Sequence, residues 1–208
     1  MSPRAARQRL KPERRAELIL EEALGLFAQR HFSIVTVRDI ALRCGINVGL
    51  IYHYFDNKEH LVRASLEHAI AQMMAGYDAL RADPDDPLGA IGPWLDMHAT
   101  IAPTIARMVK VMADYAASGT RDDAVDRAIA GFYAQERRLL EETLAEGMAA
   151  GRFRTIDAPR LARLVGLHLD GIFHASASRG DDRIKEDIAE LRAFLAHYLG
   201  IEAAAPQR

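Results

Sequence analysis

The chain has 208 residues, of which 50% are hydrophobic and 27% charged, a composition typical of a globular protein. No run of about eighteen apolar residues occurs, so the sequence predicts no membrane span. The basic N-terminus lacks the apolar segment of a secretory signal. The one cysteine, Cys44, excludes an intrachain disulfide. Together these features favour a cytoplasmic protein.

Charge is distributed unevenly along the chain. Residues 1–65 contain eleven Lys and Arg against seven Asp and Glu, a charge of +4, which leaves −6 for the remainder because the whole chain carries −2. A basic N-terminal part and an acidic C-terminal part indicate that only the former meets a polyanion. A solvated basic tail is the alternative.

Helical periodicity runs through the chain, and no segment alternates in the manner of a strand. The first helix is expected over about 12–29. Thr36 caps a short helix over 37–44 that ends at Gly45, and Asn47 caps a second short helix over 48–55. Asp56 or Asn57 then caps a longer helix that runs to about residue 80.

Residues 83–87 break the helical pattern. Prolines 93 and 103 leave the limits of the next helices open, because an interior proline ends or kinks a helix. Further helices are expected at about 88–101, 103–118, 121–150, 158–178 and 182–199. The sequence therefore predicts an all-α fold.

Two short helices joined by a glycine-containing turn form a helix-turn-helix, whose second helix enters the major groove of DNA. The expected core of this segment comprises Ile40, Ala41, Ile46, Ile51 and Phe55. Lys58 opens the following helix, where its ammonium and the nearby backbone N–H groups suit a phosphate.

The runs TVRDIA and CGINVGLIYHYFDNKEHL resemble the DNA-binding domain of TetR-family regulators, over about residues 12–62. The resemblance implies a three-helix DNA-binding domain over 1–60 and a helical ligand-sensing and dimerisation domain over 61–208. The residues that it places on DNA are Thr36, Arg38, Asn47, Val48, Gly49, Leu50, Tyr52, His53, Tyr54 and Lys58.

Valine at position 48 departs from the family, which often has a basic or polar residue there. Base reading is then expected from Arg38 on guanine, from Tyr52 and His53, and from Val48 or Leu50 against thymine methyl groups. Arg4, Arg7 and Arg9 of the basic tail are expected to add phosphate or minor-groove contacts.

Several of these side chains also have purely structural interpretations. Tyr54 fits the core as well as it fits a phosphate contact, and Phe55 fits the core better. Arg38 has Asp39 or Glu59 as alternative ion-pair partners. Cys44 fits a small buried hydrophobe better than a redox sensor.

We find no catalytic motif and no cofactor-binding or metal-binding motif, so the sequence predicts neither an enzyme nor a cofactor. His168, Asp170 and His174 are close in sequence, but the first two are about 200° apart around a helix. Asp170 and His174 share a face and suit a pair or a ligand contact better than a metal site.

The helix expected at 158–178 is apolar nearly all round. The last helix carries a regular apolar seam, formed by Ile184, Ile188, Leu191, Leu195 and Tyr198. Both features indicate a partner subunit. The resemblance likewise implies a dimer formed through the last two helices. Two-fold symmetry then predicts an inverted-repeat operator with half-sites about 34–36 Å apart, or a multiple. The expected interface residues are Leu164, Leu167, His168, Ile172, Ile188, Leu191, Leu195 and Tyr198.

The resemblance also implies a sensing pocket for a small-molecule effector among the middle helices of the C-terminal domain. The methionine-rich and aromatic side chains there suit a medium-sized apolar ligand, although ordinary core packing explains the same pattern. The candidate lining residues are Trp94, Met97, His98, Met108, Met112, Tyr115, Phe132, Tyr133 and His174.

The hypothesis that combines these features is a homodimeric, ligand-responsive transcriptional regulator that binds double-stranded DNA, in this family more often a repressor. A helical protein that kept the fold but binds protein partners is one alternative, supported by the apolar Val48 and Leu50. A small helical enzyme is the other.

Overall fold

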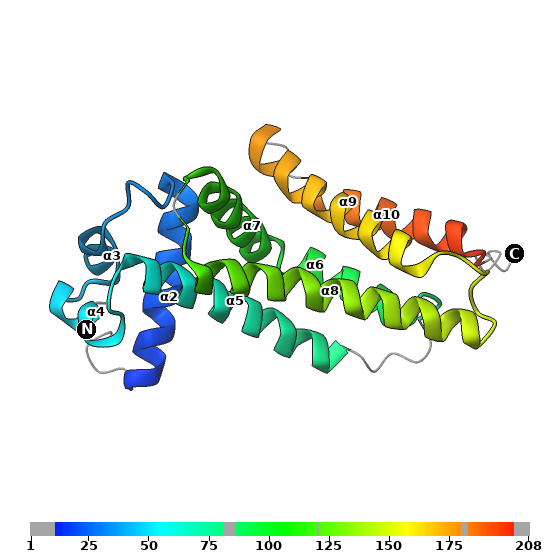
Figure 1. Cartoon of the computed structure of the whole chain (residues 1–208), viewed down its shortest axis with the longest axis horizontal. Helices are drawn as coiled ribbons and strands as arrows, with labels where there is room; N and C mark the ends of the chain where they lie inside the picture. Colours follow the sequence, from blue (N-terminus) through cyan, green and yellow to red (C-terminus); the bar gives the residue numbers. More distant parts are fainter. Residues whose placement is uncertain (1–10, 81–85, 120, 180–182, 202–208) are drawn as a thin grey trace, which may run out of the picture. The chain divides into compact units, whose positions relative to one another are not determined.

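A computed structural model describes residues 11–80, 86–119, 121–179 and 183–201. These residues form helices and turns and contain no strand, so the expected all-α fold is confirmed. None of the described helices is long and apolar enough to cross a membrane. The helices are α2 (Pro12–Arg30), α3 (Val37–Cys44), α4 (Val48–Tyr54), α5 (Lys58–Leu80), α6 (Ile91–Thr100), α7 (Ala102–Ala117), α8 (Asp123–Ala149), α9 (Ala158–Arg179) and α10 (Ile184–Leu199), labelled in Figure 1.

The predicted helices are all present, with limits that differ by up to three residues. The largest shift is at α6, which begins at Ile91 instead of residue 88. Asp86 explains it, because its carboxylate accepts the Leu88 N–H at 2.8 Å and its carbonyl accepts the Gly89 N–H, which holds 86–89 in a turn. Pro93 and Pro103 lie in first turns, where a helix needs no N–H donor.

Packing divides the chain into two compact units. Unit 1 comprises Met1–Gln72 and Arg107–Ala130, and unit 2 comprises Met73–Ala106 and Gly131–Arg208. This division differs from the single boundary expected after residue 60. Helices α5, α7 and α8 each contribute to both units.

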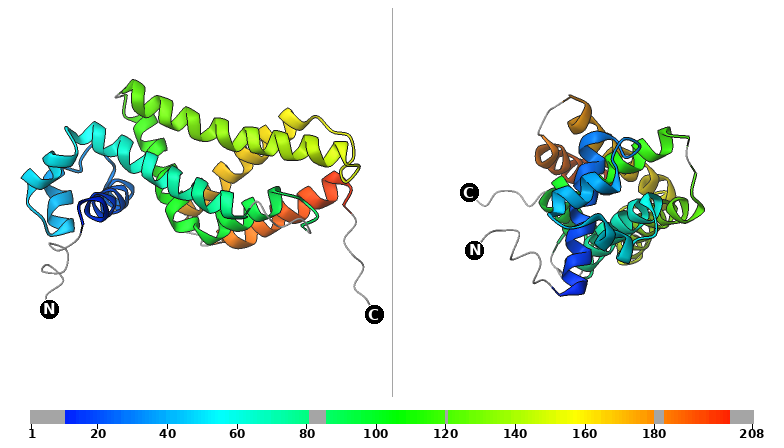
Figure 2. Two further views of the ribbon diagram at one scale, coloured as in Figure 1. Left: turned by 90° about the horizontal axis from the view of Figure 1, so that it is seen from below. Right: turned by 90° about the vertical axis from the view of Figure 1, so that its left-hand side faces the viewer.

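In unit 1, α3 packs against α2 and α4 (Figures 1 and 2). Their contact is apolar because each helix turns small or branched side chains inward. Ile19, Ala23 and Phe27 of α2, with Ile40 of α3, are fully buried. The helix-turn-helix thus rests on α2.

In unit 2, α10 packs against both α6 and α9. A charged clamp adds to the apolar contact: the Arg192 guanidinium of α10 donates to the carboxylates of Asp86 and Asp96 and to the Gly92 carbonyl. The Asp86 carboxylate is buried and lies where a Cβ on Gly92 would stand. The clamp therefore ties the last helix to the start of α6.

The turn after α8 depends on a glycine. The Gly147 carbonyl accepts the N–H groups of Arg152 and Phe153, and the buried Phe153 ring occupies the place of a Cβ on Gly147. We expect Gly147→Ala to lower the free energy of unfolding by about 1–3 kcal/mol, because the ring has to leave its site. Urea denaturation at a fixed protein concentration measures this change.

Gly131→Ala is the matched control, since Gly131 lies in α8 with nothing within 4 Å of its Cβ position. Alanine favours a helix there, so this variant should be as stable as the wild type or slightly more stable. Equal stability of the two variants would contradict the close packing at Gly147.

Candidate nucleic-acid interface

Helix α3 is stabilised at both ends by its own sequence. The Thr36 hydroxyl accepts the Asp39 N–H at 3.2 Å, and the Thr36 N–H donates to the Asp39 carboxylate at 2.8 Å. The Thr36 hydroxyl also donates to the Asp39 carboxylate at 2.7 Å. This bond, followed by the one from the Thr36 N–H, lowers the pKa of Asp39, so the carboxylate stays charged at neutral pH. At the other end Gly45 adopts φ 67°, which favours glycine. The predicted cap and stop are confirmed.

Helix α4 presents most of its surface to solvent. The Asn47 side chain accepts the Gly49 N–H at 2.8 Å and begins the helix, while Ile51 anchors it in the core. Tyr52 and His53 are exposed, and the remaining predicted reading residues, Val48 and Leu50, are partly exposed.

Gly49 is exposed as well, and its conformation does not require glycine. A Cβ there would meet only the Asn47 Oδ1, at 3.4 Å. Folding therefore gives little reason for a glycine at this position, which leaves the close approach of another molecule as its physical use.

Arg38 is exposed on α3, and neither alternative partner engages it. Asp39 instead lies 3.6 Å from the Arg30 guanidinium. Within the part of the chain that the structure describes, Arg38 makes no ion pair, so its guanidinium is available to a ligand. Tyr54 is half-buried, which is compatible with both a core role and a phosphate contact. Phe55 and Cys44 are core residues.

Lys58 has a structural role that the sequence did not reveal. Its ammonium donates to the carbonyl oxygens of Phe32 at 3.1 Å and Ser33 at 3.0 Å, and it lies 5.5 Å from the centre of the Phe32 ring. Lys58 thereby fastens the segment before α3 to the start of α5. One of its three N–H donors remains for a phosphate.

We expect Lys58→Met to lower the free energy of unfolding by about 2 kcal/mol, because two carbonyl groups lose charged hydrogen bonds. Affinity for DNA should fall with it, since the segment that leads to Thr36 loses its attachment. Denaturation and fluorescence anisotropy with duplex DNA measure the two effects. Lys110→Met is the control: its partner is the neighbouring Asp114 on α7, and it should cost about 0.5 kcal/mol or less.

The nine candidate ligand residues are divided between the two units. Met108, Met112 and Tyr115 belong to unit 1 and are buried there. The Tyr115 ring lies 6.0 Å from that of Phe32, and its hydroxyl accepts the Asp122 N–H at 2.6 Å. Burial of this phenol raises its pKa. These contacts are sufficient to explain the aromatic and methionine pattern of α7 as core packing.

The other candidates lie in unit 2, where Trp94, Met97, His98 and Phe132 are buried and Tyr133 is partly exposed. His174 is exposed on α9, and of its two expected roles the ligand contact stays a prediction, since among the described residues no bond joins it to Asp170. The Asp170 carboxylate instead accepts the Tyr133 hydroxyl at 3.3 Å.

Sequence reasoning missed Glu136, whose carboxylate lies 3.0 Å from the Nε2 of the buried His98. Its spacing of three residues from Tyr133, on one face of α8, was the available signal. Among the described residues no three His, Cys, Asp or Glu side chains are grouped as a metal site.

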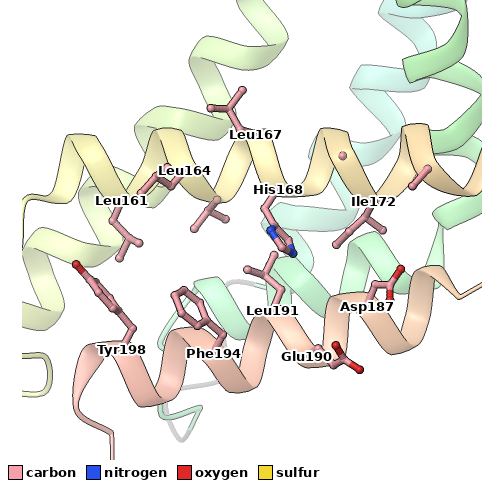
Figure 3. A pocket seen from close by; sticks show the side chains of 13 residues that line it. Leu161, Leu164, Leu167, His168, Ile172, Asp187, Glu190, Leu191, Phe194 and Tyr198 are labelled. Atoms are coloured by element: carbon pink, nitrogen blue, oxygen red, sulfur yellow. The ribbon is translucent and has the colours of Figure 1, made fainter.

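An open apolar groove of about 780 Å³ lies between α9 and α10 (Figure 3). Leu164 and Leu167 of α9 are 53% and 57% exposed, so a single chain does not bury α9 on every side. Phe194 of α10 is 55% exposed. Of the expected interface residues, the groove is lined by Leu164, Leu167, His168, Ile172, Leu191 and Tyr198.

Two of the expected interface residues, Ile188 and Leu195, do not line the groove. Both are buried, at 2% and 0% exposure, because the seam of α10 packs into its own chain. The face that α10 presents at the groove is instead carried by Phe194 and Tyr198, with Asp187 and Glu190 at one end (Figure 3). The sequence pattern identified an apolar seam but not which molecule covers it.

Comparison with known proteins identifies the same segment. Residues 19–65 match the family model described as bacterial regulatory proteins, tetR family. The chain is 30% identical over 154 residues to the HTH-type transcriptional repressor KstR2 of Rhodococcus jostii, which covers 70% of each chain. It is 23% identical over 193 residues to the HTH-type transcriptional regulator BetI of Brucella canis, over 93% of each chain.

The fold has solved counterparts as well. A putative transcriptional regulator from Pseudomonas aeruginosa PAO1 superimposes with a TM-score of 0.74 at 20% identity, over 96% of this chain and 97% of that one. The exposed α4, the capped α3 and these relatives agree: the chain belongs to the tetR family of bacterial regulatory proteins and is a DNA-binding transcriptional regulator.

Proposed function

We propose that this protein is a repressor that binds an inverted-repeat operator as a homodimer and is released by a small-molecule effector. The observation that carries the proposal is the exposed surface of Arg38, Gly49, Tyr52 and His53 on two short helices with well-defined caps. A relative of 30% identity is named a transcriptional repressor. A protein that binds operators on a bacterial chromosome would be located in the cytoplasm.

Base reading is assigned to the side chains that this surface offers. Arg38 suits a guanine edge, and Tyr52 and His53 suit polar base edges. Val48 and Leu50 suit thymine methyl groups. Thr36, Asn47, Tyr54 and the third donor of Lys58 suit phosphates. The basic Arg4, Arg7 and Arg9 lie outside the described residues and stay a prediction from sequence.

A second copy of the chain is the proposed occupant of the groove between α9 and α10. Leu164, Leu167 and Phe194 expose a contiguous apolar face, which a monomer rarely leaves in water. Two-fold symmetry lets the same face cover itself. The dimer then presents two copies of α4 to two half-sites.

Selection from random duplex DNA by the purified protein tests the proposal, at two salt concentrations. We expect an inverted repeat to be enriched, with affinity that falls steeply as salt rises because phosphate contacts release counterions. Arg38→Ala should weaken binding by about 10–100-fold, the value of one good base contact. Arg138→Ala, an exposed residue of unit 2, is the control.

Two results would count against the proposal. Enrichment of no sequence by folded protein would favour the alternative in which this fold binds protein partners. Enrichment of a single half-site would contradict binding as a homodimer. A reporter gene placed behind the recovered sequence then gives the direction of regulation, and repression requires lower expression when the protein is present.

A further inference from the structure

A polar cluster connects three helices of unit 2. On α6, His98 is 2% exposed; its Nδ1 lies 2.8 Å from the Trp94 carbonyl, and its Nε2 lies 3.0 Å from Glu136 Oε1 of α8. Because a carbonyl only accepts, Nδ1 carries a proton. A hydrogen bond between Nε2 and the Glu136 carboxyl then needs one further proton, which lies either on Nε2 or on Glu136. In both cases the His98–Glu136 pair has no net charge.

Asp170 of α9 adds a negative charge that this pair does not balance. Its carboxylate accepts the Tyr133 hydroxyl, and burial, followed by the nearby Glu136, raises its pKa against the effect of that bond. The same carboxylates, after burial, raise the pKa of Tyr133. Among the described residues no Lys or Arg forms an ion pair with Glu136 or Asp170. When Asp170 is ionised the cluster carries one uncompensated charge.

Two aromatic rings lie beside His98 in this cluster, and the Tyr133 hydroxyl bonds to Asp170. The Trp94 ring lies 4.4 Å and the Phe173 ring 6.3 Å from that of His98. Tyr133 is 37% exposed, whereas Glu136 is largely buried, so the cluster reaches the surface at Tyr133. The face of a Trp, Tyr or Phe ring attracts an organic cation.

Trp94 supplies an independent sign of a missing partner. It is 1% exposed, and its indole N–H has no acceptor among the described residues. Trp94 precedes His98 by one helical turn, so it lies on the face of α6 that His98 turns toward Glu136. A buried donor of this kind is expected to have an acceptor.

We propose that the cluster of Trp94, His98, Tyr133, Glu136 and Asp170 is the effector site, and that it selects a small organic cation carrying a hydrogen-bond acceptor. The cationic group lies between Asp170 and Glu136 against the Tyr133 ring, and the acceptor takes the Trp94 N–H. The effector role rests on the proposed function, a repressor released by a ligand. The binding site itself does not.

The chain contains one tryptophan, Trp94, so its fluorescence reports on this cluster alone. The full chain is titrated with 2-amino-1-phenylethanol, an aromatic amino alcohol, and with 1-phenyl-1,2-ethanediol, which replaces the ammonium by a neutral hydroxyl. We expect a saturable change with the amine and binding of the diol weaker by about tenfold or more. Asp170→Asn should weaken the amine by a similar factor.

Glu146→Gln is the matched control, since Glu146 is an exposed carboxylate on α8, and its affinity for the amine should equal that of the wild type. Glu136→Gln is a second test if Asp170→Asn does not fold. Equal binding of amine and diol, an unchanged affinity in both variants, or no saturable signal up to about 10 mM, ten times a weak Kd, would overturn the site.

Operator binding separates this inference from the proposed function. The wild type without amine should bind the selected DNA, and saturating amine should weaken that binding. Saturable amine binding with unchanged operator affinity would overturn the effector role. Failure to bind any DNA would overturn the proposed function while the fluorescence titration still decides the cation site.

Discussion

Replacing Arg192 with methionine is expected to lower the free energy of unfolding by about 3 kcal/mol. The reason is Asp86, whose buried carboxylate keeps only the Leu88 N–H once the guanidinium is gone. An unpaired buried charge costs far more than an exposed ion pair contributes. Asp96 adds little to this effect because it is exposed.

Urea denaturation at one fixed protein concentration measures this change, since assembly also affects apparent stability. Arg138→Met is the matched control: its partner, Glu142, is on the same exposed helix face, and the loss should be about 0.5 kcal/mol or less. The double variant Arg192→Met with Asp86→Leu should regain part of the stability, because it removes the stranded charge. Equal stability of both single variants would contradict the clamp.

Replacing Phe194 with glutamate is expected to raise the dissociation constant of the proposed dimer by about 100-fold or more. Phe194 is 55% exposed in the groove beside Leu164, and a second copy that covers the groove would bury the new carboxylate without a partner. Burial of an unpaired charge costs about 3 kcal/mol, which corresponds to that factor. Operator affinity should fall as well, because a monomer reaches one half-site.

Sedimentation across a range of protein concentrations gives the dissociation constant directly. Leu42→Glu is the control, since Leu42 is an 80% exposed leucine of α3 outside the groove, and its oligomeric state should match the wild type. Phe194→Leu should also retain the dimer. A dimer of unchanged strength in Phe194→Glu would show that another surface holds the two copies together.

The helix-turn-helix was predictable because its signals are local. Thr36 and Asp39 are three residues apart and bond to each other, and Gly45 stops the helix by its own backbone conformation. Ile40 and Ile51 are buried as expected, since the helical period alone places them on inward faces. The exposure of Tyr52 and His53 follows from the same period.

The C-terminal site was less predictable, because its contacts join residues far apart in the chain. Glu136 meets His98 across 38 positions, and Tyr133 meets Asp170 across 37. A carboxylate on a helix is usually solvated. The spacing from Tyr133 places Glu136 on one face of α8, but it does not show that Glu136 is largely buried while Glu146 is exposed. The pair of Asp170 with His174, one of two alternatives that helical spacing permits, shows the same limit: the Asp170 carboxylate accepts its bond from Tyr133 on α8.

By itself, the sequence determined the all-α class, the order of the helices and the outward face of α4, since periodicity, caps and turn residues act within one or two helical turns. Only the tertiary structure decided that Lys58 holds the carbonyl groups of Phe32 and Ser33, that Arg192 closes on Asp86, and that Ile188 is core while Phe194 is surface. Each of these outcomes depends on which distant group desolvates or pairs with a side chain. That information appears only when the helices pack.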